Sequence, residues 1–144
     1  MDSEGSRLRR SVTDGAGEGR VGVGRDADIV PARAEGRALA LELGFSPTDA
    51  TLITAAISEL ARNIIQHARR GEVVVRPESE GNDCGVAVVA RDLGPGISTP
   101  EVAMEEDCGT GLGLVGASKV MDDFAVDTTA GGTTVIARKW RGAR

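Results

Sequence analysis

Two polar residues of one predicted helix, Glu59 and Asn63, are spaced so that their side chains could act together. At roughly 100° per residue, four positions leave them about 40° apart, one turn above the other. The apolar stripe beside them consists of Ile53, Ile57, Leu60 and Ile64. A carboxylate and an amide oxygen would therefore project together from the edge of a buried helix face. For the helix taken alone, a solvated Glu–Asn pair is the alternative.

Asp92 follows an apolar run and precedes two glycines, Gly94 and Gly96. Glycines let a backbone approach a flat ligand closely. A carboxylate beside them can accept a hydrogen bond from an exocyclic amino group, such as that of adenine. The same residues also fit an ordinary type II turn around Pro95 and Gly96. The motif predicts a site for a flat, amino-bearing ligand, with a plain turn as the alternative.

A second glycine-rich stretch, with Gly109, Gly111 and Gly113, leads into another predicted helix. Backbone N–H groups at a helix start, with the helix dipole behind them, can bind an anion. The stretch lacks the Gly-Lys-Ser/Thr of a Walker P-loop. It also does not join the first strand to the first helix of a βαβ unit, which disfavours a Rossmann fingerprint. An anion site is predicted, and a flexible loop is the alternative.

The helix that carries the polar pair has recognisable ends. Ser46 is suited to the N-cap and Pro47 to the first helical position. Basic residues followed by Gly71 are typical of a helix C-terminus. The preceding helix is predicted from Pro31 to about residue 43, ending at Gly44.

The remaining elements alternate between β-rich and helical patterns, and no internal repeat is found. Strands are predicted at residues 21–30, 72–76, 85–91, 124–129 and 133–139, with a polar connection at 77–85 and a helix at about 112–121. Residues 1–20 are expected to be a disordered leader, and residues 21–144 one domain. The fold class is therefore α/β: a two-layer sandwich in which helices cover one face of a mixed sheet.

Composition excludes several classes of protein. The net charge of −5 and the scarcity of aromatic residues argue against nucleic-acid binding. No apolar run approaches the roughly 20 residues of a membrane span. Two separated cysteines and one histidine do not suggest a zinc site. We expect a cytoplasmic protein with free thiols and an aliphatic core.

The three motifs, in this order, resemble the N, G1 and G2 boxes of the GHKL ATPase superfamily. Gly132-Thr133 matches the closing Gly-Thr of that superfamily, and the resemblance covers about residues 21–140. Within it, the chain looks most like the RsbT-type serine/threonine kinases, the switch kinases of bacterial partner-switching pathways. The stretches that carry this likeness are DIVPARAEGRALALELGF from Asp28, SELARNI, DLGPGI and KVMDDF.

The resemblance implies MgATP as the nucleotide and a role for each motif residue. Asn63 would ligate Mg²⁺, and Glu59 would act as general base. Asp92 would accept a hydrogen bond from the adenine amino group, with help from Thr133. The glycines would surround the nucleotide: Gly94 and Gly96 at the base, and Gly109, Gly111 and Gly113 at the phosphates. Positioning and charge neutralisation of this kind supply most of the catalysis of phosphoryl transfer.

The implied activity is phosphorylation of Ser or Thr on a STAS-domain antagonist, with a phosphatase regulatory domain as a possible second partner. Two alternatives remain: an anti-sigma factor kinase that binds a sigma factor directly, and a catalytically weak, nucleotide-dependent binding module. One departure from the family bears on the choice. The lid between Ile97 and Gly109 is short and contains no Lys or Arg; its acidic residues are Glu101, Glu105, Glu106 and Asp107.

Overall fold

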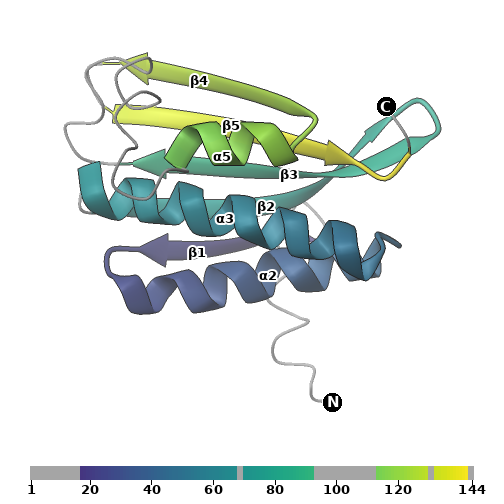
Figure 1. Cartoon of the computed structure of the whole chain (residues 1–144), viewed down its shortest axis with the longest axis horizontal. Helices are drawn as coiled ribbons and strands as arrows, with labels where there is room; N and C mark the ends of the chain where they lie inside the picture. Colours follow the sequence, from purple (N-terminus) through teal and green to yellow (C-terminus); the bar gives the residue numbers. More distant parts are fainter. Residues whose placement is uncertain (1–16, 68–69, 93–112, 130–131, 143–144) are drawn as a thin grey trace.

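The computed structural model describes residues 17–67, 70–92, 113–129 and 132–142. Its elements in chain order are β1 (Gly19–Val23), η1 (Asp26–Asp28), α2 (Ile29–Glu42), α3 (Pro47–His67), β2 (Gly71–Glu80), β3 (Asp83–Asp92), α5 (Gly113–Val120), β4 (Asp123–Thr129) and β5 (Gly132–Trp140). Figure 1 shows the helices lying along the strands as a separate layer. The predicted two-layer α/β sandwich is confirmed.

The five strands form one sheet in the order β1-β2-β3-β5-β4, and every neighbouring pair is antiparallel. The prediction of a mixed sheet is therefore wrong. The chain crosses from β3 through α5 to the edge strand β4 and then returns as β5. Because β5 is inserted between β3 and β4, those two strands run in the same direction without pairing. No parallel ladder forms among the described strands.

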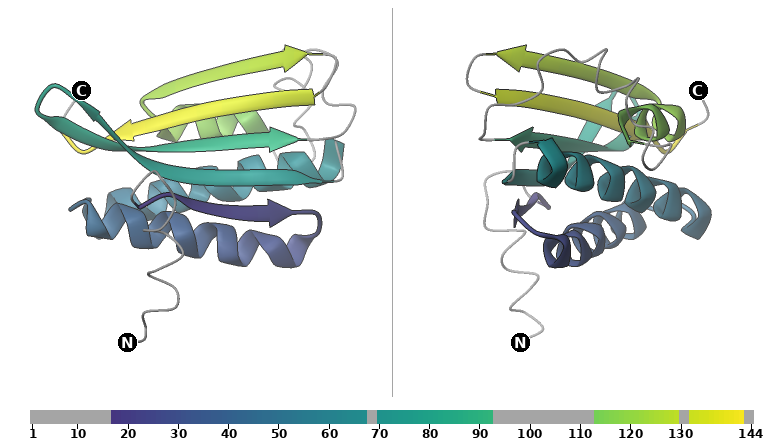
Figure 2. Two further views of the ribbon diagram at one scale, coloured as in Figure 1. Left: turned by 180° about the vertical axis from the view of Figure 1, so that it is seen from behind. Right: turned by 60° about the vertical axis from the view of Figure 1, so that its left-hand side comes forward.

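The helices cover one face of the sheet, as the turned views show (Figure 2). The face toward the helices is apolar, and α3 lies in the middle of the helix layer. On the other face, Glu72 of β2 accepts hydrogen bonds from Arg20 of β1 and Arg91 of β3, both at 2.8 Å. This ion-pair ladder matches the cross-strand register, in which Glu72 lies opposite Arg91.

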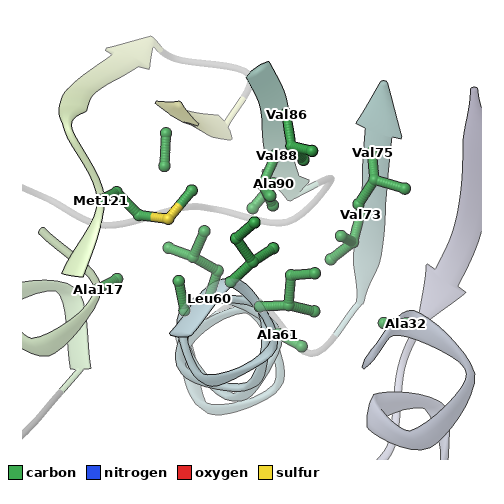
Figure 3. Packing of buried hydrophobic residues seen from close by; sticks show 14 of the residues in the cluster. Ala32, Leu60, Ala61, Val73, Val75, Val86, Val88, Ala90, Ala117 and Met121 are labelled. Atoms are coloured by element: carbon green, nitrogen blue, oxygen red, sulfur yellow. The ribbon is translucent and has the colours of Figure 1, made fainter. Parts of the chain in front are cut away.

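The core is aliphatic, as the composition predicts. Figure 3 shows α3 at its centre, facing β3 and lying between α5 and β2. The contributing side chains include Leu60 and Ala61 of α3, Val86, Val88 and Ala90 of β3, Val73 and Val75 of β2, Ala117 of α5 and Met121 directly after it. Burial of this apolar area is the main term that holds the helix layer against the sheet.

The C-terminus of α2 and the N-terminus of α3 follow the predicted signals, whereas α2 begins at Ile29, before the predicted start at Pro31 and within the range predicted as a strand. Gly44 has a φ of +90°, and its N–H donates to the Leu41 carbonyl at 3.1 Å. The Phe45 N–H donates to the Ala40 carbonyl at 3.0 Å, which completes a Schellman motif. Ser46 then caps α3, because its Oγ accepts the Asp49 N–H at 3.1 Å. A sharp turn between two helices is thus specified within six residues of sequence.

Strand boundaries differ more from the predictions. β1 begins at Gly19, inside the expected leader, and ends at Val23; residues 1–16 lie outside the described part. The expected polar connection at 77–85 is wrong, because β2 continues to Glu80 and turns through Gly81 and Asn82. β1 pairs β2 only as far as Val75, so Pro77 lies where β2 has become an edge, and its missing N–H costs no bond to β1.

None of the helices in the described ranges combines the length and hydropathy that crossing a bilayer requires.

Candidate functional site

Helix α3 carries the Glu59–Asn63 pair in the predicted way. Its apolar stripe is buried, with Ile53 and Ile57 fully inaccessible to solvent. Glu59 and Asn63 are both half-buried, at the edge of that stripe. The Glu59 side chain is only 12% exposed, and its Oε2 accepts a hydrogen bond from Nη1 of Arg62 at 2.9 Å. The carboxylate is therefore held in place and is not a freely solvated surface group.

Asp92 lies at the last position of β3 and is buried, with 6% of its surface exposed. Its Oδ1 accepts a hydrogen bond from the backbone N–H of Thr133 on β5, at 3.2 Å. A buried carboxylate requires such donors, because removing it from water without them is costly. The fold thus brings together two residues that are 41 positions apart and that the sequence assigned to one base-binding site.

Two glycines make this contact possible. A Cβ on Gly132, which has a φ of +143°, would lie 2.6 Å from the Asp92 carbonyl oxygen and 2.8 Å from Oδ1. A Cβ on Gly71, which pairs with Asp92 in the β2–β3 ladder, would lie 2.2 Å from the Arg91 carbonyl oxygen. Any side chain at either position would push its strand away from the end of β3. Both glycines therefore set the position of Asp92.

Thr133 is itself buried, at 3% exposure, and its hydroxyl lies 3.4 Å from the hydroxyl of Thr128 across the β4–β5 hairpin. Sequence reasoning assigned Thr133 to the base site but did not single out Thr128. The signal was present, because the short hairpin over residues 130–132 pairs these two threonines directly.

The predicted phosphate loop lies mostly outside the described residues, as do Gly94, Gly96, Gly109 and Gly111 together with the acidic lid. Gly113 is the first residue of α5. The next residue, Leu114, is fully buried and packs in the same core as α3. At the other end of the helix, Nζ of Lys139 donates to the Val120 carbonyl at 3.1 Å. The helix that would follow the loop is therefore fixed at both ends.

The elements that carry these residues meet at one end of the molecule. Figure 1 shows the C-terminal end of α3, the end of β3 and the beginnings of α5 and β5 at the same side. The interactions agree with this view, because Gly71, which follows α3, pairs with Asp92, and Asp92 contacts Thr133. Asn63, Asp92, Gly113 and Thr133 therefore lie on four elements whose ends meet at this side of the molecule, and Glu59 lies one turn before Asn63 on α3.

This region suits a nucleotide with a magnesium ion. Asn63 offers a half-exposed amide oxygen, a hard donor of the kind that Mg²⁺ accepts. Among the described residues, no group of three or more His, Cys, Asp or Glu side chains forms an all-protein metal site. A Mg²⁺ held here would therefore take most of its ligands from phosphate oxygens and water, which is its usual arrangement with nucleotides. The donor set fits the implied ion.

Comparison with known proteins shows the family of the chain. A family model described as a histidine kinase-like ATPase domain matches residues 24–139. The chain is 42% identical over 118 residues to the serine/threonine-protein kinase RsbT of Bacillus subtilis (strain 168); the alignment covers 78% of this chain and 89% of that kinase. The range matched by the family model includes every described residue of the candidate site.

Proposed function

Because the chain belongs to the family of histidine kinase-like ATPase domains and is an RsbT-like serine/threonine-protein kinase, we propose that it phosphorylates a STAS-domain antagonist from MgATP. The observation that carries the proposal is the buried Asp92 carboxylate, fixed by the Thr133 N–H, at the same end of the molecule as the Glu59–Asn63 edge of α3. In this proposal the two groups serve one site, Asp92 as the acceptor for adenine and Glu59 as the general base. The pathway is a partner-switching one, located in the cytoplasm.

Asp92 selects the nucleotide in this proposal. Its carboxylate accepts a hydrogen bond from the adenine amino group, while Thr133 keeps the carboxylate in orientation. A guanine base would present an oxygen to the same carboxylate, so two acceptors would face each other. Gly94 and Gly96 line the base, and Gly109, Gly111 and Gly113 surround the phosphates through their N–H groups.

Glu59 carries the proton transfer. The oxygen of a Ser or Thr hydroxyl on the partner forms a bond to the γ-phosphorus, and the bond from that phosphorus to the β-phosphate oxygen breaks to release ADP. The hydroxyl proton passes to the Glu59 carboxylate. Mg²⁺, when bound through Asn63, would neutralise charge on the phosphates. The protein positions the two reactants and supplies a proton acceptor, and these contributions account for most of the catalysis of phosphoryl transfer.

The choice of partner rests on the family resemblance and on lid charge. Switch kinases phosphorylate a STAS-domain protein, release it and then activate a phosphatase by binding its regulatory domain. A kinase that grips a sigma factor is expected to use basic contacts near the nucleotide, whereas this lid carries acids and no Lys or Arg. The same missing charge favours a catalytically weak, nucleotide-dependent binding module as the second candidate.

The proposal is tested by following phosphate transfer and complex size together. The protein is mixed with MgATP and either candidate STAS-domain proteins or sigma factors. We expect phosphate on Ser or Thr of a STAS protein, followed by its release. Glu59→Gln should slow transfer by about 10²-fold or more, the range for a removed general base, and leave ATP affinity within a few fold.

Glu42→Gln is the matched control, since it removes a carboxylate from the exposed side of α2. Transfer by this variant should equal that of the wild type. A tight, ATP-dependent complex with a sigma factor would reject the STAS assignment. ATP binding without transfer to any protein would instead favour the weak binding module.

A further inference from the structure

Arg62 is the cation in direct contact with the proposed catalytic base. It lies on α3 three residues after Glu59, and its Nη1 donates to Oε2 of Glu59 at 2.9 Å. The Arg62 side chain is 37% exposed, whereas the Glu59 side chain is 12% exposed. The guanidinium therefore reaches inward from the helix surface to a carboxylate that is mostly shielded from water.

The hydrogen bond from Arg62 restricts the orientation of the Glu59 carboxylate, as the role of a general base requires. The terminal torsion of a Glu side chain has a broad, shallow preference, so an unpaired carboxylate would sample many orientations. A general base has to lie within hydrogen-bond reach of the hydroxyl that it deprotonates. A charge-assisted bond to one oxygen limits that freedom and leaves the other oxygen to receive the proton. The planar guanidinium holds orientation better than a Lys ammonium does.

The negative charge of the proposed site residues is a second reason to consider Arg62. Glu59 and Asp92 are both acidic, and the sequence of residues 98–108 adds four acids without a single Lys or Arg. Among the described residues, the cation that contacts the Glu59 carboxylate comes from the same helix. On α3 that cation is Arg62, one position before the proposed magnesium ligand Asn63.

We propose that Arg62 is a positioning residue, which aligns the Glu59 carboxylate for phosphoryl transfer through its hydrogen bond to Oε2. The inference rests on the proposed role of Glu59 as general base. An ordinary surface ion pair at this spacing contributes little to helix stability. The two roles therefore differ in the quantity that changes when Arg62 is replaced: the rate of transfer or the stability of the fold.

The test is a double-mutant cycle on the full chain with MgATP and its protein substrate. Arg62→Ala should lower kcat by about tenfold, part of the effect of a general base, with KM for ATP within about threefold. Arg62→Lys should recover part of the loss in kcat, because a Lys ammonium can form the ion pair but lacks the planar, oriented donors of a guanidinium. In the Glu59→Gln background, Arg62→Ala should have no further effect on kcat, since the group it aligns is gone.

Arg138→Ala is the matched control. Arg138 is 31% exposed and donates to Glu78 at 3.1 Å, so this variant also loses a partly buried Arg–Glu pair, but on a different part of the sheet. Its kcat should equal that of the wild type. Arg62→Lys keeps the test decisive if Arg62→Ala does not fold.

Three outcomes would overturn the inference. An unchanged kcat in Arg62→Ala would make the contact a surface ion pair. An equal loss in the wild-type and Glu59→Gln backgrounds would show that Arg62 acts independently of Glu59, for instance on the phosphates. If Glu59→Gln transferred phosphate as fast as the wild type, Glu59 would not be the general base. That result would reject the proposed function itself, and the first measurement of the cycle would already show it.

Discussion

Asp92 shows how a residue at the end of a strand acquires a chemical role from its surroundings. Its side chain is buried at 6% exposure, at the last position of a strand that is followed in sequence by Gly94 and Gly96. The Thr133 N–H fixes Oδ1 and so decides which way the carboxylate faces. An acceptor held this way discriminates by hydrogen-bond pattern, because a mismatched partner leaves a buried polar group unpaired.

Replacing Asp92 with Asn should change both the strength and the selectivity of nucleotide binding. The amide can keep an oxygen toward Thr133, but then it presents an N–H₂ donor to the adenine amino group. We expect ATP affinity to fall about 10- to 100-fold, which corresponds to roughly 1–3 kcal/mol, and the preference for ATP over GTP to shrink. Calorimetry with both nucleotides measures this.

Asp127→Asn on the exposed side of β4 is the control for charge, and it should bind ATP as the wild type does. Equal affinity of the wild-type protein for ATP and GTP would contradict the assignment of Asp92 to the adenine amino group.

At the level of elements, the start of β5 is the part of the sheet that shapes the proposed base site. Gly132 has a φ of +143° and lies so close to Asp92 that a Cβ there would contact both its carbonyl and its carboxylate oxygens. The strand can therefore begin at this point only with glycine. The β4–β5 hairpin delivers Thr133 to the site as a consequence of this close approach.

Gly132→Ala should couple a loss of stability to a loss of ATP binding. The strained φ and the contact with Asp92 should each cost about 1–3 kcal/mol, and displacement of Asp92 should weaken ATP binding at least tenfold. Thermal unfolding and calorimetry provide the two measurements.

Gly81→Ala separates strain from site geometry. Gly81 also has a positive φ, of +62°, but a Cβ there would contact nothing within 4 Å, and it lies at the β2–β3 turn. This variant should lose some stability and keep its ATP affinity. If both variants lost affinity equally, general loosening of the sheet would explain the result and the role of Gly132 would be refuted.

At the scale of the whole molecule, α3 joins the site to the core. One side of the helix packs against β3, between α5 and β2, and its edge carries Glu59 and Asn63. Gly36 lets α2 approach α3 closely, because a Cβ there would collide with Cδ1 of Ile57. The orientation of the catalytic edge is therefore set by packing on three sides of one helix.

Ile57→Ala should destabilise the whole domain. Ile57 is fully buried between the two helices and the sheet, so its truncation leaves a cavity and should cost about 2–5 kcal/mol. Leu41→Ala, at a position 43% exposed on α2, should change the free energy of unfolding by about 0.5 kcal/mol or less. Urea unfolding of both variants measures the difference, and equal losses would show that α3 packing does not dominate stability.

Local signals allowed most of the helices and their ends to be predicted. The apolar stripe of α3, the Ser46 cap and the Gly44 terminus all depend on residues within a few positions of one another, and the structure has each of them. The β4–β5 hairpin also follows from its short glycine turn. Arg62 could have been noticed from its spacing to Glu59, since residues three apart on a helix are neighbours.

Predictions that depended on distant partners were less successful. The extent of β2 past Pro77 depends on where β1 stops pairing, and the antiparallel sheet depends on β5 entering between β3 and β4. Neither feature can be predicted from the local sequence pattern, because strand pairing depends on burial and hydrogen bonding across the whole sheet. The glycine loop and lid lie outside the described residues, so their roles remain proposals.

By itself, the sequence determined which residues could do chemistry and on which helix or strand most of them lie. Periodicity, caps and motif spacing are local properties, and they are sufficient for that purpose. Only the tertiary structure decided that Asp92 meets Thr133, that Gly71 and Gly132 lie close against the end of β3, and that Arg62 contacts Glu59 at 2.9 Å. These contacts depend on strand register and on side-chain orientation in a packed core, which chain segments far apart in sequence set jointly.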